Sequence, residues 1–481
     1  MHPTLLFGVR CRSGDNALPF REPGIHVRRL IDPAELRELA RLGLPMVATQ
    51  FCIMAMGFLD TAMAGNYASV DLAGVALGGN VLWPLFMLMS GLNMALTPMS
   101  AQLRGEGKVT AIGPLTRQGL WVALLASGVT VLVLLNASMV FALFDVDAEA
   151  ARIGERYLAA AAWGIPGVML YVTLRYTCEG LGRTLPPMVI AASALVINGI
   201  LNYIFIYGKL GMPAMGGEGC GWATALTMWI ELGLILLLLR CHWFRETGIL
   251  DRFDGLDAAR IASLVRVGLP IGLTVFLEMA VFSVLGFLVG SLGVAALAAH
   301  SIAGNINWGT YVIPLSIGSA ASIRVGYCVG RRVLDDARVV ARTATVLAFV
   351  YALGASALLL AIRGWIPTVY TSDGEVVRIT ATLLVIVAVY QVVDCTQATM
   401  VGVLRGYKDT RMPMVYSFAG LWLIALPLAA ALGFGWFGRA WDVFGFWFGM
   451  AIGLTVVCMF IGRRLWQTSR NDARVLEFAA I

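Results

Sequence analysis

The chain has 481 residues and a mass of 51.7 kDa, and 59% of its residues are hydrophobic while only 13% are charged. Soluble domains carry about 25% charged residues and need polar surface to cover their cores, so the composition excludes a soluble protein. It also excludes intrinsic disorder, and the formal net charge of +6 requires no nucleic-acid partner. We therefore expect a polytopic membrane protein.

The elements expected along the chain are twelve apolar spans, each near or above the ~20 residues that cross a bilayer. A polar, basic tail at 1–38 precedes them and lacks the apolar region of a signal peptide. The expected spans are 39–64, 71–100, 116–143, 155–181, 186–208, 217–240, 263–290, 294–324, 339–363, 376–404, 411–434 and 441–464. A second tail at 466–481 follows the last span.

Basic residues are distributed unequally between the two sides of these spans. With a cytoplasmic N-terminus, 29 of the 35 lysines and arginines fall in or beside cytoplasmic segments. The six on the opposite side are Arg152, Arg156, Lys209, Arg363, Arg378 and Arg439. Since positive residues are retained on the cytoplasmic side, we expect both termini to be cytoplasmic.

The two halves of the chain repeat each other. At a shift of 225 residues, RLGLP at 41–45 meets RVGLP at 266–270. Each half holds six expected spans, and an even number returns the chain to the same side, so the repeats are parallel. Such repeats are related by a pseudo-two-fold axis along the membrane normal. We predict an N-lobe at 39–240, a cytoplasmic linker at 241–262 and a C-lobe at 263–465.

Three acidic residues stand inside expected spans, where an ionisable group costs ~2.5–3.5 kcal/mol on insertion scales. Glu278, in VFLEMAVF, is a functional candidate, with a structural hydrogen bond as the alternative. Asp60, in MGFLDTAMAG, is either a proton or cation carrier or a solvated residue at a helix end. Asp394, in VYQVVDCTQATM, has Tyr390 one turn earlier on the same helical face.

Two kinds of cation site are compatible with these side chains. Glu278, Asp394, the Tyr390 phenol and nearby carbonyl groups could form an all-oxygen cage for Na⁺. The two carboxylates could instead share protons, because adjacent carboxylates do not readily ionise together. The sequence leaves both alternatives open.

Other polar residues inside the spans need partners. Asn198 and Asn202, in VINGILNYIF, share a helical face and could either hydrogen-bond Asp60 or join two helices. Glu231, in MWIELGLI, faces either a cavity or a surface. In the fourth span, RYTCE at 175–179 is expected to contain an i,i+4 ion pair between its arginine and its glutamate.

Several longer motifs carry a family resemblance. MGFLDTAMAG after RLGLP, VINGILNYIFIYGKLGMPAMGGEGCGWATA and EGLGRTLPPM resemble the N-lobe of the multidrug and toxic compound extrusion (MATE) family. AASIRVGYCVG, FLEMAVF and QVVDCTQATMVGVLRGYKDTRMPM are similar to its C-lobe. The resemblance covers roughly residues 35–465. The acid of span 7 together with YQVVD is typical of the bacterial NorM-type branch.

The resemblance implies an all-α membrane protein with two bundles of six transmembrane helices and a V-shaped central cleft. It implies a secondary active antiporter that exports cationic, often aromatic, drugs and dyes in exchange for Na⁺ or H⁺ by alternating access. Its expected location is the bacterial inner membrane. We expect no enzymatic activity, no cofactor and a monomer in the lipid bilayer.

The resemblance also assigns roles to single residues. Asp60 matches the N-lobe acid of the family and Asn198 its partner amide. Asn202 stands where some relatives carry an aspartate, so the resemblance does not extend to a two-acid N-lobe site. Glu278, Asp394 and Tyr390 match the C-lobe cation site and are the candidate Na⁺ ligands, whereas position 231 has no counterpart in the family pattern.

Three other classes fit the sequence less well. A major-facilitator transporter also has six plus six spans, but its span 2–3 loop carries an acid followed by a basic cluster, unlike AQLRGEGK here. A lipid-linked oligosaccharide flippase, related in fold, would line its cavity with basic residues, whereas the deep charges here are acids. A membrane-embedded enzyme would need nucleophile partners or a metal cluster, and the eight cysteines and four histidines show no such spacing.

Overall fold

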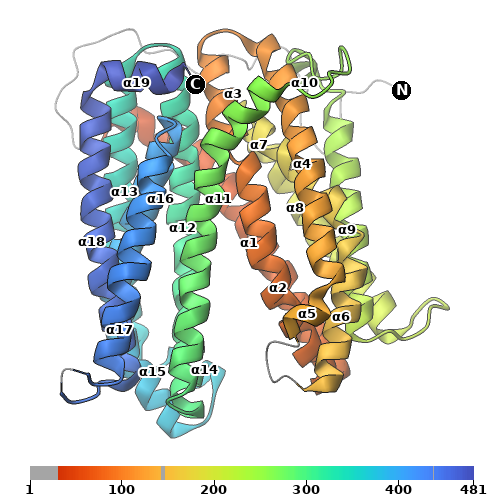
Figure 1. The fold of residues 1–481 in the computed structure, drawn as a ribbon, viewed down its shortest axis with the longest axis vertical. Coiled ribbons are helices and arrows are strands. Elements are labelled where there is room, and N and C mark those ends of the chain that lie inside the picture. Colours follow the sequence, from red (N-terminus) through yellow and green to blue (C-terminus); the bar gives the residue numbers. More distant parts are fainter. Residues whose placement is uncertain (1–30, 142–146, 437, 481) are drawn as a thin grey trace. The chain divides into compact units, whose positions relative to one another are not determined.

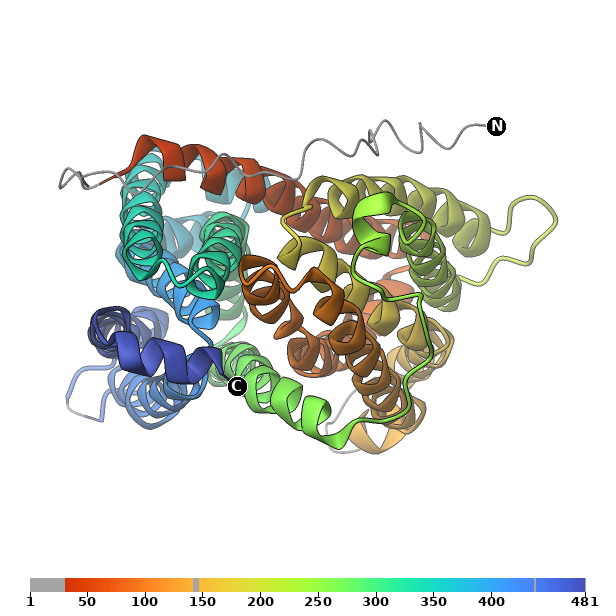
Figure 2. The ribbon, with the colours of Figure 1, turned by 90° about the horizontal axis from the view of Figure 1, so that it is seen from above.

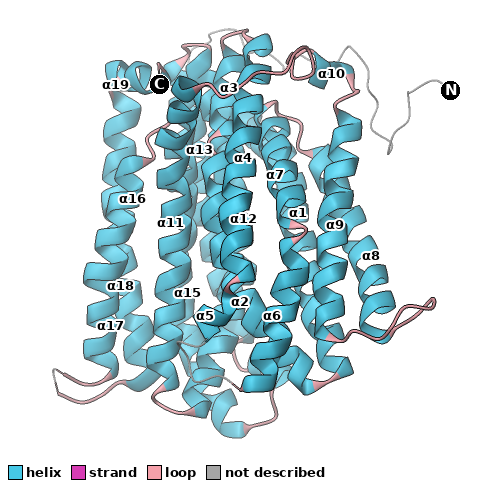
Figure 3. Cartoon of the chain, turned by 45° about the vertical axis from the view of Figure 1, so that its right-hand side comes forward, coloured by secondary structure: helices cyan, strands magenta, loops and turns pink. Residues whose placement is uncertain are grey.

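The computed structural model describes residues 31–141, 147–436 and 438–480, and these residues form helices and their connections without a strand (Figure 3). Within these ranges, eleven helices are long and apolar enough to cross a membrane, or twelve when one bent pair counts as a single span. The prediction of an all-α protein with twelve spans is therefore confirmed.

Internal contacts divide the described chain into two units. The first contains residues 45–272, and the second contains residues 31–44 and 273–480. Helix α1 (Pro33–Tyr67) thus begins in the second unit, and α11 (Ala258–Gly290) begins in the first. Both helices hold a proline near the point of division, Pro45 and Pro270, which are the prolines of the repeated motif. A proline inside a helix removes one backbone hydrogen bond and permits a bend there.

The first unit consists of α1 from residue 45, the helices that follow it in the chain, and the start of α11 (Figure 1). Its complete helices are α2 (Ser69–Asn93), α3 (Leu96–Gly105), α4 (Ile112–Leu135), α5 (Ala137–Phe141), α6 (Ala148–Ala162), α7 (Ile165–Gly180), α8 (Leu185–Tyr207), α9 (Gly217–Leu238) and α10 (His242–Arg245).

The fourth predicted span, 155–181, is not one continuous helix. The structure begins this segment earlier, at the start of α6, and bends it by 53° between α6 and α7. Pro166 lies in the first turn of α7, a position that tolerates the missing N–H. Gly164 lies in the break, where a Cβ atom would be 2.6 Å from the Cα of Ala225 on α9. The fourth span is therefore a bent pair of helices, and both α6 and α7 pack on α9.

The second unit contains the remaining helices; Figure 2 shows most of the long ones nearly end-on, whereas α19 (Asp472–Ala479) lies across the view. They are α12 (Val294–Gly330), α13 (Leu334–Ile362), α14 (Ile366–Tyr370), α15 (Gly374–Gly406), α16 (Arg411–Phe418), α17 (Leu426–Gly433), α18 (Asp442–Arg470) and α19 (Asp472–Ala479). A π-helical segment, Ala419–Ala425, joins α16 to α17 within one span. Such segments are rare and frequent at functional sites.

Two glycines allow α12 and α15 to approach closely. A Cβ atom on Gly402 of α15 would lie 2.5 Å from the backbone of Gly318 on α12, so only glycine fits this crossing. Small residues at helix contacts are the usual way in which membrane helices pack. The close contact fixes α12 and α15 against each other, and these helices carry several of the polar residues described below.

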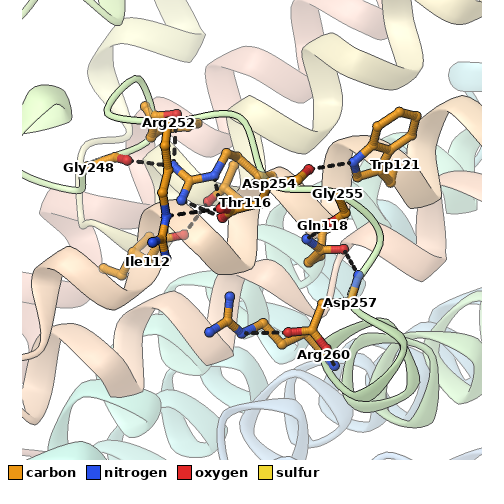
Figure 4. A network of polar contacts seen from close by, with 12 residues as sticks. Ile112, Thr116, Gln118, Trp121, Gly248, Arg252, Asp254, Gly255, Asp257 and Arg260 are labelled. Carbon is orange, nitrogen blue, oxygen red and sulfur yellow. Dashed lines mark hydrogen bonds and ion pairs between the residues drawn. The ribbon is translucent and has the colours of Figure 1, made fainter.

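The segment between α10 and α11 is held on α4 (Figure 4). Arg117 of α4 donates hydrogen bonds to Asp254 Oδ2 at 2.7 Å and to the carbonyl oxygen of Gly248 at 2.6 Å. Trp121 donates from its indole to the carbonyl oxygen of Asp254 at 3.1 Å. Gln118 donates to the carbonyl oxygen of Gly255 at 2.9 Å. The polar linker predicted from the sequence is therefore an ordered strap on the first unit.

The strap should be released when Arg117 is replaced by methionine. The Arg117 guanidinium holds the pKa of Asp254 below its ordinary value of about 3.9. A lowered carboxyl pKa means that the contact stabilises the docked strap above that ordinary value and is lost as the pH falls through the lowered one. We expect amide hydrogens of residues 246–257 to exchange faster in Arg117→Met at neutral pH. The difference from the natural protein should become smaller in acid, where Arg117 keeps only its hydrogen bonds to the backbone carbonyl oxygens of Gly248 and Ile249.

Arg252 supplies the matched control for this experiment. It also pairs with Asp254, at 3.0 Å, but its side chain is 67% exposed. Exposed ion pairs contribute little to stability, so Arg252→Met should leave the exchange rates unchanged. Equal exchange in the two variants would contradict the role given to Arg117.

Candidate functional site

The first group of candidate residues surrounds Asp60 inside the first unit. Asp60 lies on α1 and is only 7% exposed, so it is not a solvated residue at a helix end. Asn202 of α8 donates from Nδ2 to Asp60 Oδ1 at 2.6 Å and also to Asn198 Oδ1 at 3.0 Å. The Thr224 hydroxyl of α9 donates to Asp60 Oδ2 at 3.3 Å. The structure thus brings Asp60, Asn198 and Asn202 together.

Unused hydrogen-bonding capacity remains beside Asp60. Asn202 Oδ1 and Asn198 Nδ2 are buried and have no hydrogen-bond partner among the described residues. A buried amide atom without a partner costs about 1–3 kcal/mol, so these atoms are available to a bound ion, water or ligand. Sequence reasoning missed Thr224, because a hydroxyl in a membrane span usually bonds its own helix, as Thr227 does to the carbonyl oxygen of Ala223.

The second group lies in the second unit around Glu278 of α11. The Gln397 amide of α15 donates to Glu278 Oε1 at 3.3 Å, and the Ser417 hydroxyl of α16 donates to the same atom at 3.5 Å. Trp422, in the π-helical segment, donates from its indole to the carbonyl oxygen of Leu277 at 3.2 Å. The irregular span therefore contacts the backbone and the carboxyl group at this point of α11.

Asp394 lies on α15, one turn before Gln397, and is 8% exposed. Asn307 of α12 donates from Nδ2 to Asp394 Oδ2 at 3.2 Å, and its own Oδ1 is buried without a partner among the described residues. Asp394 and Glu278 are close enough for their charges to interact. Asn307 was missed by sequence reasoning, although an amide inside a span was the signal that identified Asn198 and Asn202.

Tyr390 has a different environment from the one its helical position predicted. It is 1% exposed, and its ring packs edge-on against Phe282 and Trp447, with centroids 6.2 Å and 5.6 Å away. No hydrogen bond joins Tyr390 to either carboxyl group within the described chain. The side chains that donate hydrogen bonds to the two acids come from α12, α15 and α16.

An aromatic pair on α12 lies beside the two acids. Tyr311 is near enough to Glu278 and Asp394 for an electrostatic interaction with both. Its ring stacks on Trp308, with centroids 5.8 Å apart and planes inclined by 25°. Trp308 is 44% exposed, and the Tyr311 ring lies between it and the two carboxyl groups in the chain of contacts. Negative charge beside an aromatic face is the chemistry that recognises organic cations.

Comparison with known proteins agrees with the repeat seen in the sequence. A family model described as MatE matches residues 45–204 and 270–431. The two matched ranges begin 225 residues apart (270 minus 45), which is the shift that superimposes the repeated motif.

Two relatives align over nearly the whole chain. The chain is 39% identical over 464 residues to multidrug resistance protein PmpM of Pseudomonas aeruginosa, covering 96% of each chain. It is 38% identical over 454 residues to multidrug resistance protein MdtK of Edwardsiella ictaluri, covering 93% of this chain and 98% of the relative. The crystal structure of the eukaryotic MATE transporter AtDTX14 has the same fold, with a TM-score of 0.84 at 21% identity over 93% of this chain and 98% of that one.

Proposed function

The chain belongs to the MatE family, and from this premise we propose that it exports cationic and aromatic compounds across the bacterial inner membrane in exchange for Na⁺ or H⁺. It is a multi-pass transporter and not an enzyme. The observation that carries the proposal is the pair of polar groups described above, one around Asp60 and one around Glu278 and Asp394. Each surrounds acids on apolar helices with uncharged hydrogen-bonding side chains.

Charge balance explains how such groups couple two solutes. A carboxylate in an apolar bundle is costly unless a cation or a proton compensates its charge. A coupling ion and a cationic drug both provide that compensation, so they compete for the same acids. Exchange follows if each ligand has different affinities in the outward-open and inward-open states, as linkage requires. Entry of the coupling ion then drives export of the drug.

The group around Asp394 is the candidate for a bound Na⁺, written here as a transported ion. Glu278 and Asp394 would supply charge, and the unpartnered Oδ1 of Asn307 a neutral oxygen. Tyr390 remains a candidate ligand through its place one turn from Asp394. The alternative to Na⁺ is a proton that the carboxyl groups of Glu278 and Asp394 share. The Asp60 group has one acid and two amides, which favours a proton or a drug cation.

The remaining predictions are also proposals. We propose that the protein acts as a monomer, with the N-lobe at 39–240 and the C-lobe at 263–465. Both termini would be cytoplasmic, because 29 of 35 basic residues then lie on the cytoplasmic side. The exposed ring stack on α12 would contact the aromatic part of a substrate.

Purified protein in liposomes tests the proposal. A fluorescent organic cation should accumulate only while an ion gradient is imposed, and collapse of the gradient with an ionophore should release it. Chemical conversion of the cation without a gradient, or accumulation that the ionophore does not affect, would contradict the proposed antiport.

A further inference from the structure

A second buried acid of the first unit, Glu231, lies outside the Asp60 group. It is on α9 and is 6% exposed. No described residue donates a hydrogen bond to its carboxyl group or forms an ion pair with it within 4.0 Å. A carboxyl group in this position needs a source of charge compensation.

Helix α7 packs beside α9 in a parallel direction, and its glycines establish the register. A Cβ atom on Gly164 would meet Ala225, and one on Gly167 would meet Trp229, so contacting residues are 61 or 62 positions apart. The same register places Tyr171 of α7 level with residues 232 and 233 of α9, directly after Glu231. Long side chains on a helix lean toward its N-terminus, so the arginine one turn beyond Tyr171 also extends toward this level.

The side chains of α7 at this level form a charged cluster. Arg175 Nε donates to Glu179 Oε1 at 2.9 Å, and the two side chains are 13% and 6% exposed. Arg175 also acts electrostatically on Glu231. The Tyr171 hydroxyl is buried without a hydrogen-bond partner among the described residues. One guanidinium thus faces two carboxyl groups, which leaves one negative charge uncompensated when both are ionised.

The other helices packed on α9 place their titratable side chains elsewhere. Asp71 of α2 lies at Gly216 and Gly217, and Tyr157 of α6 lies at Gly221. These contacts are ten or more residues from position 231, which is about 15 Å along a helix. The tyrosines of α8 lie near the N-terminal end of α9, because Gly219 of α9 contacts the α8 backbone at residue 205. Among the described residues, the α7 cluster is therefore the charged environment of this acid.

A polar stripe on α9 connects the two acids of this unit. Cys220, Thr224, Thr227 and Glu231 follow one another at spacings of four, three and four residues, which places them on one helical face. Thr224 donates to Asp60. Seven residues separate it from Glu231, or about 10 Å along the helix. Asp60, through Thr224, and Glu231 therefore meet successive levels of the same α9 face.

We propose that Glu231 is a second proton-binding site of this unit, where the bound proton neutralises the carboxylate that the Arg175–Glu179 ion pair leaves uncompensated. A proton fits this cluster better than a metal ion does. The neighbouring guanidinium repels a metal cation, and only one carboxyl group and one phenol stand outside the ion pair. Protonation neutralises Glu231 and leaves a balanced cluster, and deprotonation restores an unpaired charge inside the bundle.

Infrared difference spectroscopy of the purified protein tests the site directly. A pH step should reveal the carbonyl stretch of protonated carboxyl groups, and labelling with ¹³C-glutamate should shift the bands that arise from glutamate. We expect Glu231→Gln to remove one shifted band. Glu218→Gln is the matched control on the same helix, since Glu218 lies at the surface beside Arg156, and it should leave that band intact.

A second variant keeps the proposal testable if Glu231→Gln does not fold. Glu231→Asp retains a carboxyl group but replaces the glutamate. Its carbonyl band should therefore remain, and ¹³C-glutamate labelling should no longer shift it. An unchanged spectrum in Glu231→Gln would overturn the proposal. The proposal would also be overturned if ¹³C-glutamate labelling shifted the same bands in Glu231→Asp as in the natural protein.

Discussion

Asp394→Asn is expected to abolish gradient-driven transport of a fluorescent cation, and Glu278→Gln is expected to do the same. Both substitutions remove the charge that a coupling cation or a cationic drug compensates. Both also preserve the shape of the side chain, so Asn307, Gln397 and Ser417 keep an oxygen to which they can donate. We expect initial rates to fall by at least about tenfold, which corresponds to ~1.4 kcal/mol of activation free energy.

Glu375→Gln supplies the control for this loss. Glu375 lies in the first turn of α15, the helix that carries Asp394, but it is exposed. This variant should transport at the rate of the natural protein. Transport at that rate by either Asp394→Asn or Glu278→Gln, with equal protein in the liposomes, would refute the assignment of these acids.

Asp60→Asn should cause a loss of similar size in the first unit. The Asp60 carboxylate accepts hydrogen bonds from the Asn202 amide and the Thr224 hydroxyl. An asparagine at position 60 would leave this cluster of side chains without a negative charge. Asn202→Ala should be milder, because the acid remains while its 2.6 Å hydrogen bond is lost. Removing a donor from a buried charged group costs about 1–3 kcal/mol.

Initial rates measured over a range of coupling-ion concentrations separate these two variants. Asp60→Asn should lower the maximal transport rate, and raising the coupling-ion concentration should not restore it. Asn202→Ala should change the concentration that gives half the maximal rate. Equal loss of transport in the two variants would contradict this order, because it would make the Asn202 amide as essential as the Asp60 carboxylate.

Much of the architecture follows from features that a single sequence displays. Apolar length predicts the spans, and the shift of 225 residues predicts the two-fold repeat that the family match reproduces. The acids Asp60, Glu278 and Asp394 could be identified because a charge inside an apolar run is conspicuous. Asn198 and Asn202 were found for the same reason, and their spacing of four placed them on one face.

The partners of these acids could be predicted only in part. Thr224, Asn307 and Ser417 are uncharged, and such residues are common in spans, so their sequence context does not single them out. Which residues meet across two helices depends on where the helices cross. That crossing is determined by contacts such as the one between Gly318 and Gly402, which pattern reasoning does not reveal.

The π-helical segment could not be predicted from the sequence, and it contacts the backbone of α11 through the Trp422 indole. The bend between α6 and α7 lies at Gly164 and Pro166, and Gly164 packs closely against α9. Arg117 was counted only as a basic residue of the cytoplasmic side. Its hydrogen bonds to the strap follow from tertiary structure, because the positive-inside rule predicts a side and not a partner.

The most direct test of the central claim is dye export from liposomes with Na⁺ and H⁺ gradients imposed separately. We expect at least one gradient to drive export by the natural protein, and neither to drive export by Asp394→Asn. Export that needs neither gradient, or that continues undiminished after the substitution, would contradict the exchange of a coupling cation for a drug at these carboxyl groups.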